Sequence, residues 1–308
     1  MRRLLLLPVL ACAAAATARA DAGDAWAVAK GAIPADTNYV VGINVDALRA
    51  TSMFAGVYAH FTDHTETRGT IDQIRTACDI DVKDAVQGAV IAATDTADDG
   101  AVYLAGPRFD AKTVVECMQK FAAQSQKKQK VTAGAPDAQG IVELSADGEK
   151  EKLYFAFPKK GVMVMTFKPT QKKQLQRWLG GKGAGAGSDL GRSLGKVSPS
   201  SAIAWGALAG RKDLGDPGAR VKAGVGQATA AGGKVQIEVR ATMASAKDAQ
   251  NGKAMVQREL GDMRKEQGTP PEVLRALDTL KTSVAGDELT VTATMPEADV
   301  SSLLKQMH

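Results

Sequence analysis

One serine has the sequence neighbours of a hydrolase nucleophile. Residues 191–195 read Gly-Arg-Ser-Leu-Gly and match the pattern G-x-S-x-G, in which a strained turn between a strand and a helix exposes the hydroxyl. The chemistry also needs a histidine base, and the only histidine that follows Ser193 in the sequence is His308, the last residue. A glycine-rich stretch precedes the motif in place of a strand, so the sequence favours a linker over a nucleophile.

Two histidines have the spacing of metal ligands. His60 and His64 lie four residues apart at the end of a predicted helix, so both imidazoles could face one ion, with Asp63 and Glu66 nearby. The protease pattern H-E-x-x-H does not occur. Because polar residues at a helix end are typical of a solvated terminus, these histidines are weak candidates, and we expect no metal and no other cofactor.

Two cysteines follow residue 20, and each lies on the apolar face of a predicted helix. An even pair, Cys78 and Cys117, suggests one disulfide in an oxidising compartment. Closing a loop of this length stabilises by about 4 kcal/mol in the chain-entropy model. Two buried free thiols fit the apolar spacing equally well, so both alternatives stay open. No histidine is placed by the pattern to activate either thiol.

Charge is distributed unevenly along the chain. Residues 21–111 contain 6 basic and 14 acidic side chains, whereas residues 127–182 contain 12 basic and 5 acidic ones. Two faces that attract each other within one domain are the simplest interpretation, and an ordinary solvated face is another. The third is a docking patch for an anionic envelope component or a protein partner, made by Lys127, Lys128, Lys130, Lys159, Lys160, Lys172 and Lys173. We expect residues 127–130 and the 158–161 turn at one end of a meander.

Composition argues against nucleic-acid and nucleotide partners. The formal net charge of +5 includes Arg2, Arg3 and Arg19, so the chain after residue 20 has a net charge of only +2. Aromatic residues make up 5% of the chain, which is too few for a base-stacking surface. The glycine-rich run lacks G-x-G-x-x-G, no GK[ST] triplet occurs, and Gly224-x-Gly226 falls inside a predicted strand.

The first twenty residues have the pattern of a secretory signal peptide. Arg2 and Arg3 precede an apolar run from Leu4 to Ala16, and Ala18-Arg19-Ala20 supplies an A-x-A cleavage site. We therefore expect the mature chain to begin at Asp21 and to reside in the periplasm or outside the cell.

A lipid anchor is the alternative at this end of the chain. Val9-Leu10-Ala11-Cys12 loosely matches the box in which a lipid is attached to a cysteine, but Leu10 is bulkier than usual and the A-x-A site fits better. No later apolar run approaches the ~20 residues of a spanning helix, so we expect no transmembrane segment in the mature chain.

Both strands and helices are predicted to position these residues. The pattern predicts strands at 39–45, 86–94, 101–105, 141–145, 152–157, 162–167, 202–208, 219–229 and 234–243, with a last hairpin turning at 286–287. Helices are predicted from 46, around 70–78, at 110–124, 169–180, 246–266, 270–280 and 297–306. Along 234–243 apolar and polar side chains alternate, which predicts one buried and one solvent-exposed face.

This order predicts an α+β fold of two similar lobes, with antiparallel sheets and helices packed on one face. The first lobe is residues 21–180 and the second 199–308, joined by a glycine-rich linker over 181–198. Each lobe ends in a short helix opened by a proline, Pro169 or Pro296, and the shared order suggests a diverged duplication.

No motif is specific enough to name a family. The hypothesis that fits best is an exported, non-catalytic protein that acts by surface binding. One alternative is a secreted hydrolase that uses Ser193 or a metal at His60 and His64. The other is a periplasmic carrier that holds an apolar ligand in a cleft between the lobes.

Overall fold

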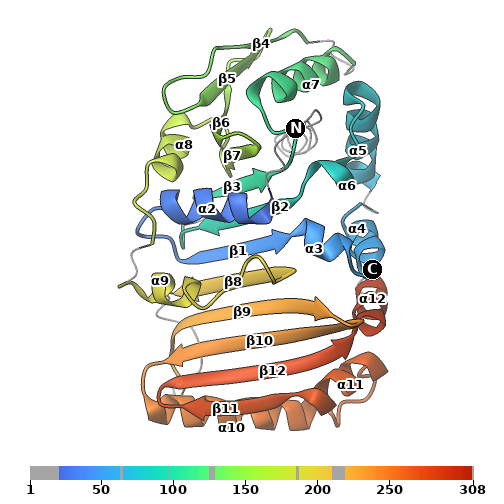
Figure 1. Cartoon of the computed structure of the whole chain (residues 1–308), viewed down its shortest axis with the longest axis vertical. Coiled ribbons are helices and arrows are strands. Elements are labelled where there is room, and N and C mark those ends of the chain that lie inside the picture. Colours follow the sequence, from blue (N-terminus) through green and yellow to red (C-terminus); the bar gives the residue numbers. More distant parts are fainter. Residues whose placement is uncertain are drawn as a thin grey trace. The chain divides into compact units, whose positions relative to one another are not determined.

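The computed structural model describes residues 21–62, 65–96, 98–124, 129–184, 187–209 and 219–306. Within these ranges it contains eleven helices and twelve strands, and the strand pairings are antiparallel, which confirms the predicted α+β class (Figure 1). No helix in these ranges is both long and apolar enough to cross a membrane. The signal sequence and Cys12 lie outside the described residues.

Contacts divide the chain into two units that exchange short segments. Unit 1 comprises the residues up to Thr37, Gly42–Asp46 and Tyr58–Ala184; unit 2 comprises Asn38–Val41, Ala47–Val57 and the residues from Gly185 onward. This division is not sequential, unlike the two lobes expected from the sequence.

Strand β1 (Tyr39–Asn44) is where the chain passes between the units. Its beginning belongs to unit 2, where the Ala209 amide donates to the Asn38 carbonyl (2.8 Å). Its end belongs to unit 1, where the Val45 amide donates to the Gln87 carbonyl (2.9 Å). Helices α3 (Val45–Arg49) and α4 (Phe54–Thr62) also contribute residues to both units.

The sheet of unit 1 follows the order β2-β3-β7-β6-β5-β4. Its strands are β2 (Gly88–Ala93), β3 (Gly100–Ala105), β4 (Val131–Ala133), β5 (Ile141–Ala146), β6 (Leu153–Lys159) and β7 (Val162–Thr166). Its helices are α2 (Ala22–Ala32), α5 (Thr65–Cys78), α6 (Val82–Ala85), α7 (Ala111–Gln124) and α8 (Lys172–Leu179).

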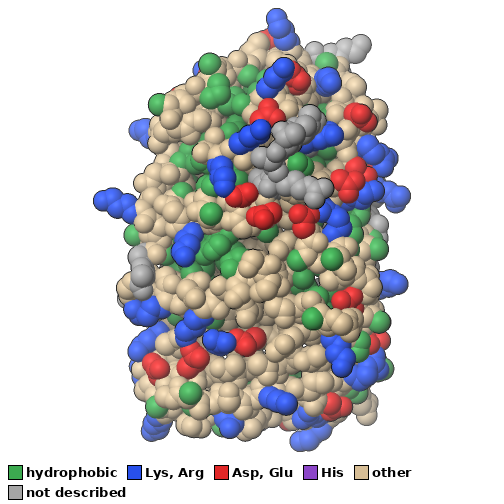
Figure 2. All heavy atoms as spheres, viewed as in Figure 1, with side chains coloured by type: hydrophobic (Ala, Val, Ile, Leu, Met, Phe, Trp, Pro, Cys, Tyr) green, Lys and Arg blue, Asp and Glu red, His purple; other side chains and the backbone are tan. Residues whose placement is uncertain are grey.

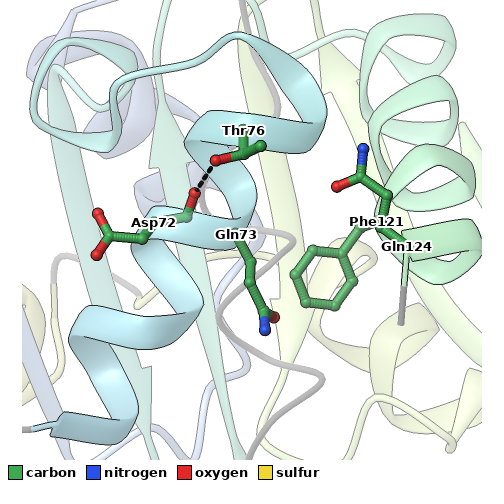
Figure 3. A pocket seen from close by; sticks show the side chains of 5 residues that line it. All are labelled: Asp72, Gln73, Thr76, Phe121 and Gln124. Atoms are coloured by element: carbon green, nitrogen blue, oxygen red, sulfur yellow. Dashed lines mark hydrogen bonds between the residues drawn. The ribbon is translucent and has the colours of Figure 1, made fainter. Parts of the chain in front are cut away.

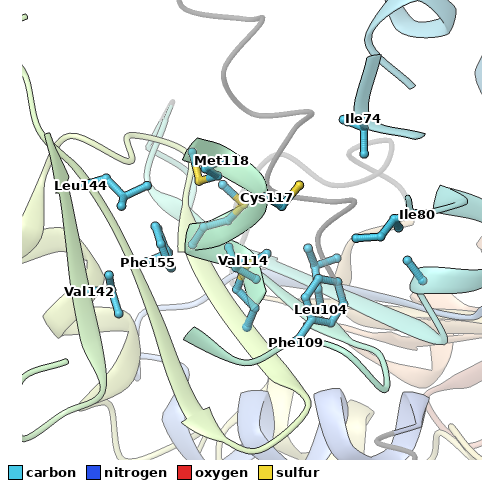
Figure 4. Close-up of a cluster of buried hydrophobic side chains, with 13 residues drawn as sticks. Ile74, Ile80, Leu104, Phe109, Val114, Cys117, Met118, Val142, Leu144 and Phe155 are labelled. Carbon is cyan, nitrogen blue, oxygen red and sulfur yellow. The ribbon is translucent and has the colours of Figure 1, made fainter. Parts of the chain in front are cut away.

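The main core of unit 1 lies between α7 and one face of this sheet. Asp110 begins α7, since its carboxylate accepts from the Thr113 amide (2.9 Å). Helical spacing then places Val114, Cys117 and Met118 on one buried face. Figure 4 shows these side chains opposite others from the sheet, among them Val142, Leu144 and Phe155.

Helices cover both faces of this sheet, where the sequence analysis expects them on one. All five residues of β7 are buried, which requires cover on each side. Met163 faces the α7 core, whereas on β3 the Tyr103 hydroxyl donates to the Trp178 carbonyl of α8 (2.7 Å). Burial raises the pKa of the Tyr103 phenol.

Helix α2 covers β2 and β3 and is not predicted from the sequence. Asp21 and Asp24 form a capping box at its start. Gly88 of β2 allows its close approach, since a Cβ at this position would lie 2.3 Å from the Ala22 Cα.

The sheet of unit 2 follows the order β11-β12-β10-β9-β8, with the beginning of β1 next to β8. Its strands are β8 (Ala204–Ala209), β9 (Val221–Ala231), β10 (Lys234–Met243), β11 (Lys281–Ala285) and β12 (Glu288–Pro296). Its helices are α9 (Asp189–Leu194), α10 (Ala246–Met263), α11 (Pro271–Thr279) and α12 (Glu297–Gln306), with α10 behind the strands in Figure 1.

Helix α9 forms within the glycine-rich stretch that the sequence analysis expects to be irregular. Ser188 caps it by accepting from the Gly191 amide (3.0 Å). Leu190 and Leu194 are buried, and the helix packs on β8 and β9. Burial of these two leucines offsets the entropic cost of the glycines.

Both units use the same return connection. In unit 1 the last strand, β7, pairs with β3, the strand before helix α7. In unit 2 the last strand, β12, pairs with β10, the strand before helix α10. A short helix follows each last strand. The diverged duplication stays a prediction.

Candidate functional site

The serine motif does not form a nucleophile elbow. Ser193 lies in the last turn of helix α9 instead of at a turn between a strand and a helix, and the residue is only 4% exposed. Its expected base, His308, lies outside the described residues. The buried hydroxyl is therefore not presented to a substrate.

The histidine pair cannot be assembled from the described residues. His60 lies in the last turn of α4, while His64 lies outside the described ranges. Among the residues that are described, no group of three or more side chains is arranged to hold a metal ion.

The two cysteines meet. Cys78, at the end of α5, and Cys117, in α7, have their sulfur atoms 1.98 Å apart and their Cα atoms 5.1 Å apart, as a disulfide. Disulfides are typical of proteins in oxidising compartments, which agrees with the expected export.

A small open pocket of about 230 Å³ lies between the same two helices. Figure 3 shows Gln73 of α5 and Phe121 of α7 pointing toward each other across it. The Asp72 carboxylate is paired with Arg75 (2.7 Å), and the Thr76 hydroxyl donates to the Asp72 carbonyl (2.8 Å). Among the described residues that line this pocket, the one hydroxyl belongs to Thr76, and it donates to a backbone carbonyl instead of to a side chain that could act as a base.

The predicted basic patch is not gathered in one place. The Lys130 carbonyl accepts from the Asp147 amide (3.0 Å), just beyond the end of β5 that pairs with Leu153 at the start of β6. Lys159 and Lys160 lie at the other end of β6, about 20 Å away at the rise of a strand. The antiparallel register therefore separates stretches that we expected together, and Lys127 and Lys128 lie outside the described residues.

Several of these lysines pair with the acidic segment or with nearby carboxylates. Lys159 contacts Asp24, and Lys172 lies 3.0 Å from Asp137. Lys173 is exposed. Figure 2 shows acidic and basic side chains of unit 1 intermingled on the visible face. This pattern fits the simplest interpretation of the uneven charge, in which the two segments attract each other within one domain.

Asp99 is the centre of the densest of these charge contacts. Its carboxylate accepts from the Trp178 indole (3.0 Å), the Gln174 amide (3.2 Å) and Arg177 (2.5 Å), and Arg177 also contacts Asp36 (2.6 Å). Burial opposes ionisation, but the hydrogen bonds from Trp178 and Arg177 outweigh it and hold the pKa of Asp99 below its usual value. These contacts fasten the β2–β3 turn to α8 and leave the carboxylate occupied.

The sheet of unit 2 gathers most of the exposed large apolar side chains. Six such side chains occur among the described residues, and four of them lie on one face of this sheet. Their exposed fractions are 44% for Val41, 37% for Leu208, 37% for Ile237 and 43% for Val239. Single exposed apolar residues are ordinary, but their concentration on one face marks a candidate contact surface.

Five small residues lie between these four. The register pairs Gly206 with Gly226 across β8 and β9, Ala204 with Ala228, and Leu208 with Gly224. Directly opposite residues project from the same face, so glycines and alanines form a low floor. We call this depression the β9 trough: its floor is Ala204, Gly206, Gly224, Gly226 and Ala228, its walls are Val41, Ile237 and Val239, and its end is Leu208.

The walls are placed by the neighbouring strands. On β10, Val239 is opposite Gly226, and Ile237 is opposite Ala228. On the other side, a Cβ at Gly206 would lie 3.5 Å from the Val41 Cγ2. A Cβ at Gly224 would lie 3.6 Å from the Leu208 Cγ, so Leu208 leans over the end of the floor.

Strand β10 is buried at its ends and open at its centre on this face. Val235 packs with Met53 and Ile203, and Met243 packs with Ala249 of α10 and Leu289. The exposure of Ile237 and Val239 between them corrects the expectation that the whole apolar side of 234–243 is buried. Alternation identifies the face of a strand, but burial depends on which elements pack against it.

The trough can bind but has no group that performs catalysis. Its nine residues are glycine, alanine, valine, leucine and isoleucine, without a titratable or nucleophilic side chain. The available signal in the sequence is Gly224-x-Gly226: two glycines on one side of a strand indicate a place where another group approaches the backbone.

Comparison with known proteins identifies a fold but no family. No protein-family model matches the chain, and no curated protein matches its sequence. Crystal form III of TP0453 is similar with a TM-score of 0.53 and 10% identity, covering 90% of this chain and 97% of that one. Crystal form IV of TP0453 has a TM-score of 0.50 and 10% identity, with 89% and 95% covered. At this identity the likeness concerns the fold alone.

Proposed function

We propose that this is an exported, non-catalytic protein that acts by binding a partner through an apolar surface, the β9 trough. The observation that carries the proposal is the gathering of Val41, Leu208, Ile237 and Val239 around a floor of glycine and alanine. Burying apolar side chains against a partner is favourable by about 25 cal/mol per Å², so this face gains from being covered.

Export is supported by the signal pattern in the sequence and by the disulfide. Binding in preference to catalysis is supported by the chemistry of the trough, which offers contact area and no reactive group. The buried Ser193 gives no support to a serine hydrolase.

A photo-crosslinking experiment in cells of the source organism tests the proposal. Benzoylphenylalanine replaces Val239 in one variant and Gln236 in another; Gln236 is an exposed residue on the opposite face of the same strand. Irradiation should give a discrete adduct at position 239 and none at 236. Equal adducts at both positions, or none at 239, would show that the trough is not the binding surface.

A further inference from the structure

Resting on the function proposed above, we propose that the occupant of the β9 trough is one amphipathic α-helix presented by a partner protein. Three properties of the trough lead to this choice: the glycines in its floor, its dimensions and its shallow form. The shallow form also argues against an acyl chain, and the small area argues against a second copy of this chain.

The floor is built for close approach of another backbone. Gly206 and Gly226 face each other in the middle of two paired strands. At such a position glycine stabilises the folded protein less than a residue with a side chain does. A Cβ at Gly226 would meet no atom closer than 3.6 Å, the distance to the Val239 Cγ2. The intramolecular packing therefore does not require glycine here. Glycine inside a strand otherwise marks a site where a ligand or a backbone comes near.

The dimensions fit one helix. Strands β1 and β10 are three strand spacings apart, so the walls stand about 14 Å from each other. From Ala228 to Gly224 the floor runs four residues, again about 14 Å. A helix with its side chains is about 10–12 Å across, and about nine helical residues span 14 Å. Two or three apolar side chains spaced i, i+3/i+4 and i+7 would contact the floor.

The shallow form favours a helix over an acyl chain. The walls are valine and isoleucine side chains on a sheet, so the trough covers one side of its occupant. An acyl chain is apolar all round and would keep its outer side in water. An amphipathic helix needs cover only along an apolar stripe of about 100° and presents its polar side to solvent.

The area argues against a second copy of this chain. A floor of about 14 Å by about 14 Å offers about 200 Å². A stable protein dimer buries about 800 Å² on each partner. Self-association through the trough alone is therefore too small an interface, whereas a single docked helix needs no more than a few anchoring side chains.

Adduct mapping distinguishes these occupants. Benzoylphenylalanine is placed at Val41 in one variant and at Val239 in another, so that both walls are probed in cells of the source organism. Mass spectrometry of the digested adducts then identifies the attached molecule and the residues that carry the crosslinks.

We expect adducts from both walls on one segment of one partner protein, at positions two or five residues apart, because the two walls contact opposite flanks of the helix. Adducts on adjacent residues would indicate an extended strand, whose side chains alternate between opposite sides. Adducts of lipid mass would indicate an acyl chain, and adducts to the trough of this chain would indicate a second copy. Each of these three results overturns the helix but keeps the proposed binding function. The absence of adducts at both positions overturns both.

A trough-filling variant gives the second readout. Gly226→Val, combined with the crosslinker at Val41, should lower the adduct yield about tenfold or more, since it places two methyl groups where the helix approaches. Circular dichroism establishes that this variant keeps its fold. An unchanged yield in a folded variant would contradict the proposal.

Discussion

The Asp99 carboxylate connects the β2–β3 turn to helix α8, and its partner Arg177 also contacts Asp36. Trp178, Arg177 and Gln174 all donate to it, and its side chain is 20% exposed. A hydrogen bond to a charged group contributes about 1.5–3 kcal/mol to folding stability. Removing the acceptor costs more when it leaves a buried donor without a partner.

The first prediction concerns the neutral variant Asp99→Asn. We expect it to lower the free energy of unfolding by about 2 kcal/mol, because Arg177 loses a charged acceptor beside Trp178. Urea unfolding followed by circular dichroism measures the change. Asp98→Asn is the matched control, since Asp98 is the adjacent residue, is 64% exposed and, among the described residues, pairs with the Lys168 side chain at 3.3 Å. Equal effects of the two substitutions would contradict this assignment.

The second prediction concerns pH. The pKa of Asp99 is lower in the folded protein than its ordinary value of about 3.9, so the carboxylate contributes stability above that value. This contribution is lost as the pH falls through the folded pKa. The stability difference between wild type and Asp99→Asn should therefore be full at pH 6 and shrink below about pH 4. A difference that stays constant down to pH 2 would count against the charged network.

At the scale of elements, the disulfide is the covalent link between α5 and α7. We expect the double variant Cys78→Ser and Cys117→Ser to be about 4 kcal/mol less stable, because the unfolded chain gains the freedom of the open loop. Urea unfolding with and without a reductant measures this. Reductant should destabilise the wild type and leave the double variant unchanged. A wild type that is insensitive to reduction would contradict the prediction.

In strand β9 we predict a substitution that stabilises the protein. Gly226→Val should raise the free energy of unfolding by about 0.5–1 kcal/mol, because valine suits a strand better than glycine and has room above the floor. Thermal and urea unfolding test this expectation. Gly232→Val is the contrasting variant, since Gly232 has a φ of +58° that valine rarely adopts, and it should destabilise. Destabilisation by Gly226→Val would mean that the glycine serves packing within the sheet.

Over the whole molecule, local signals predict most of the elements. The β9–β10 hairpin follows from alternation around Gly232-Gly233, both of which have positive φ, and α7 follows from Asp110 and the spacing of its apolar residues. Helix α2 is not predicted from the sequence, although Asp21 and Asp24 form its capping box. Helix α9 is not predicted either, because it is stabilised by packing of its leucines on β8 and β9, and the glycine content of the sequence does not reveal this packing.

The candidate site is harder to predict from the sequence than the fold, for a physical reason. Ser193, His60 and the lysines are selected by residue type and spacing, but their positions depend on burial and on strand register. The trough combines β1, β8, β9 and β10, and its character comes from apolar side chains that no described helix or strand covers. A repeating pattern cannot distinguish a face that is covered from one that stays open.

The measurement that tests the central claim most directly is made on Gly226→Val, with unfolding stability and crosslinking at Val41 determined on the same protein. The account predicts a variant that is as stable as the wild type or more stable, and whose adduct is lost. A variant that is equally stable and forms the adduct in undiminished yield would show that the trough is not where the partner binds.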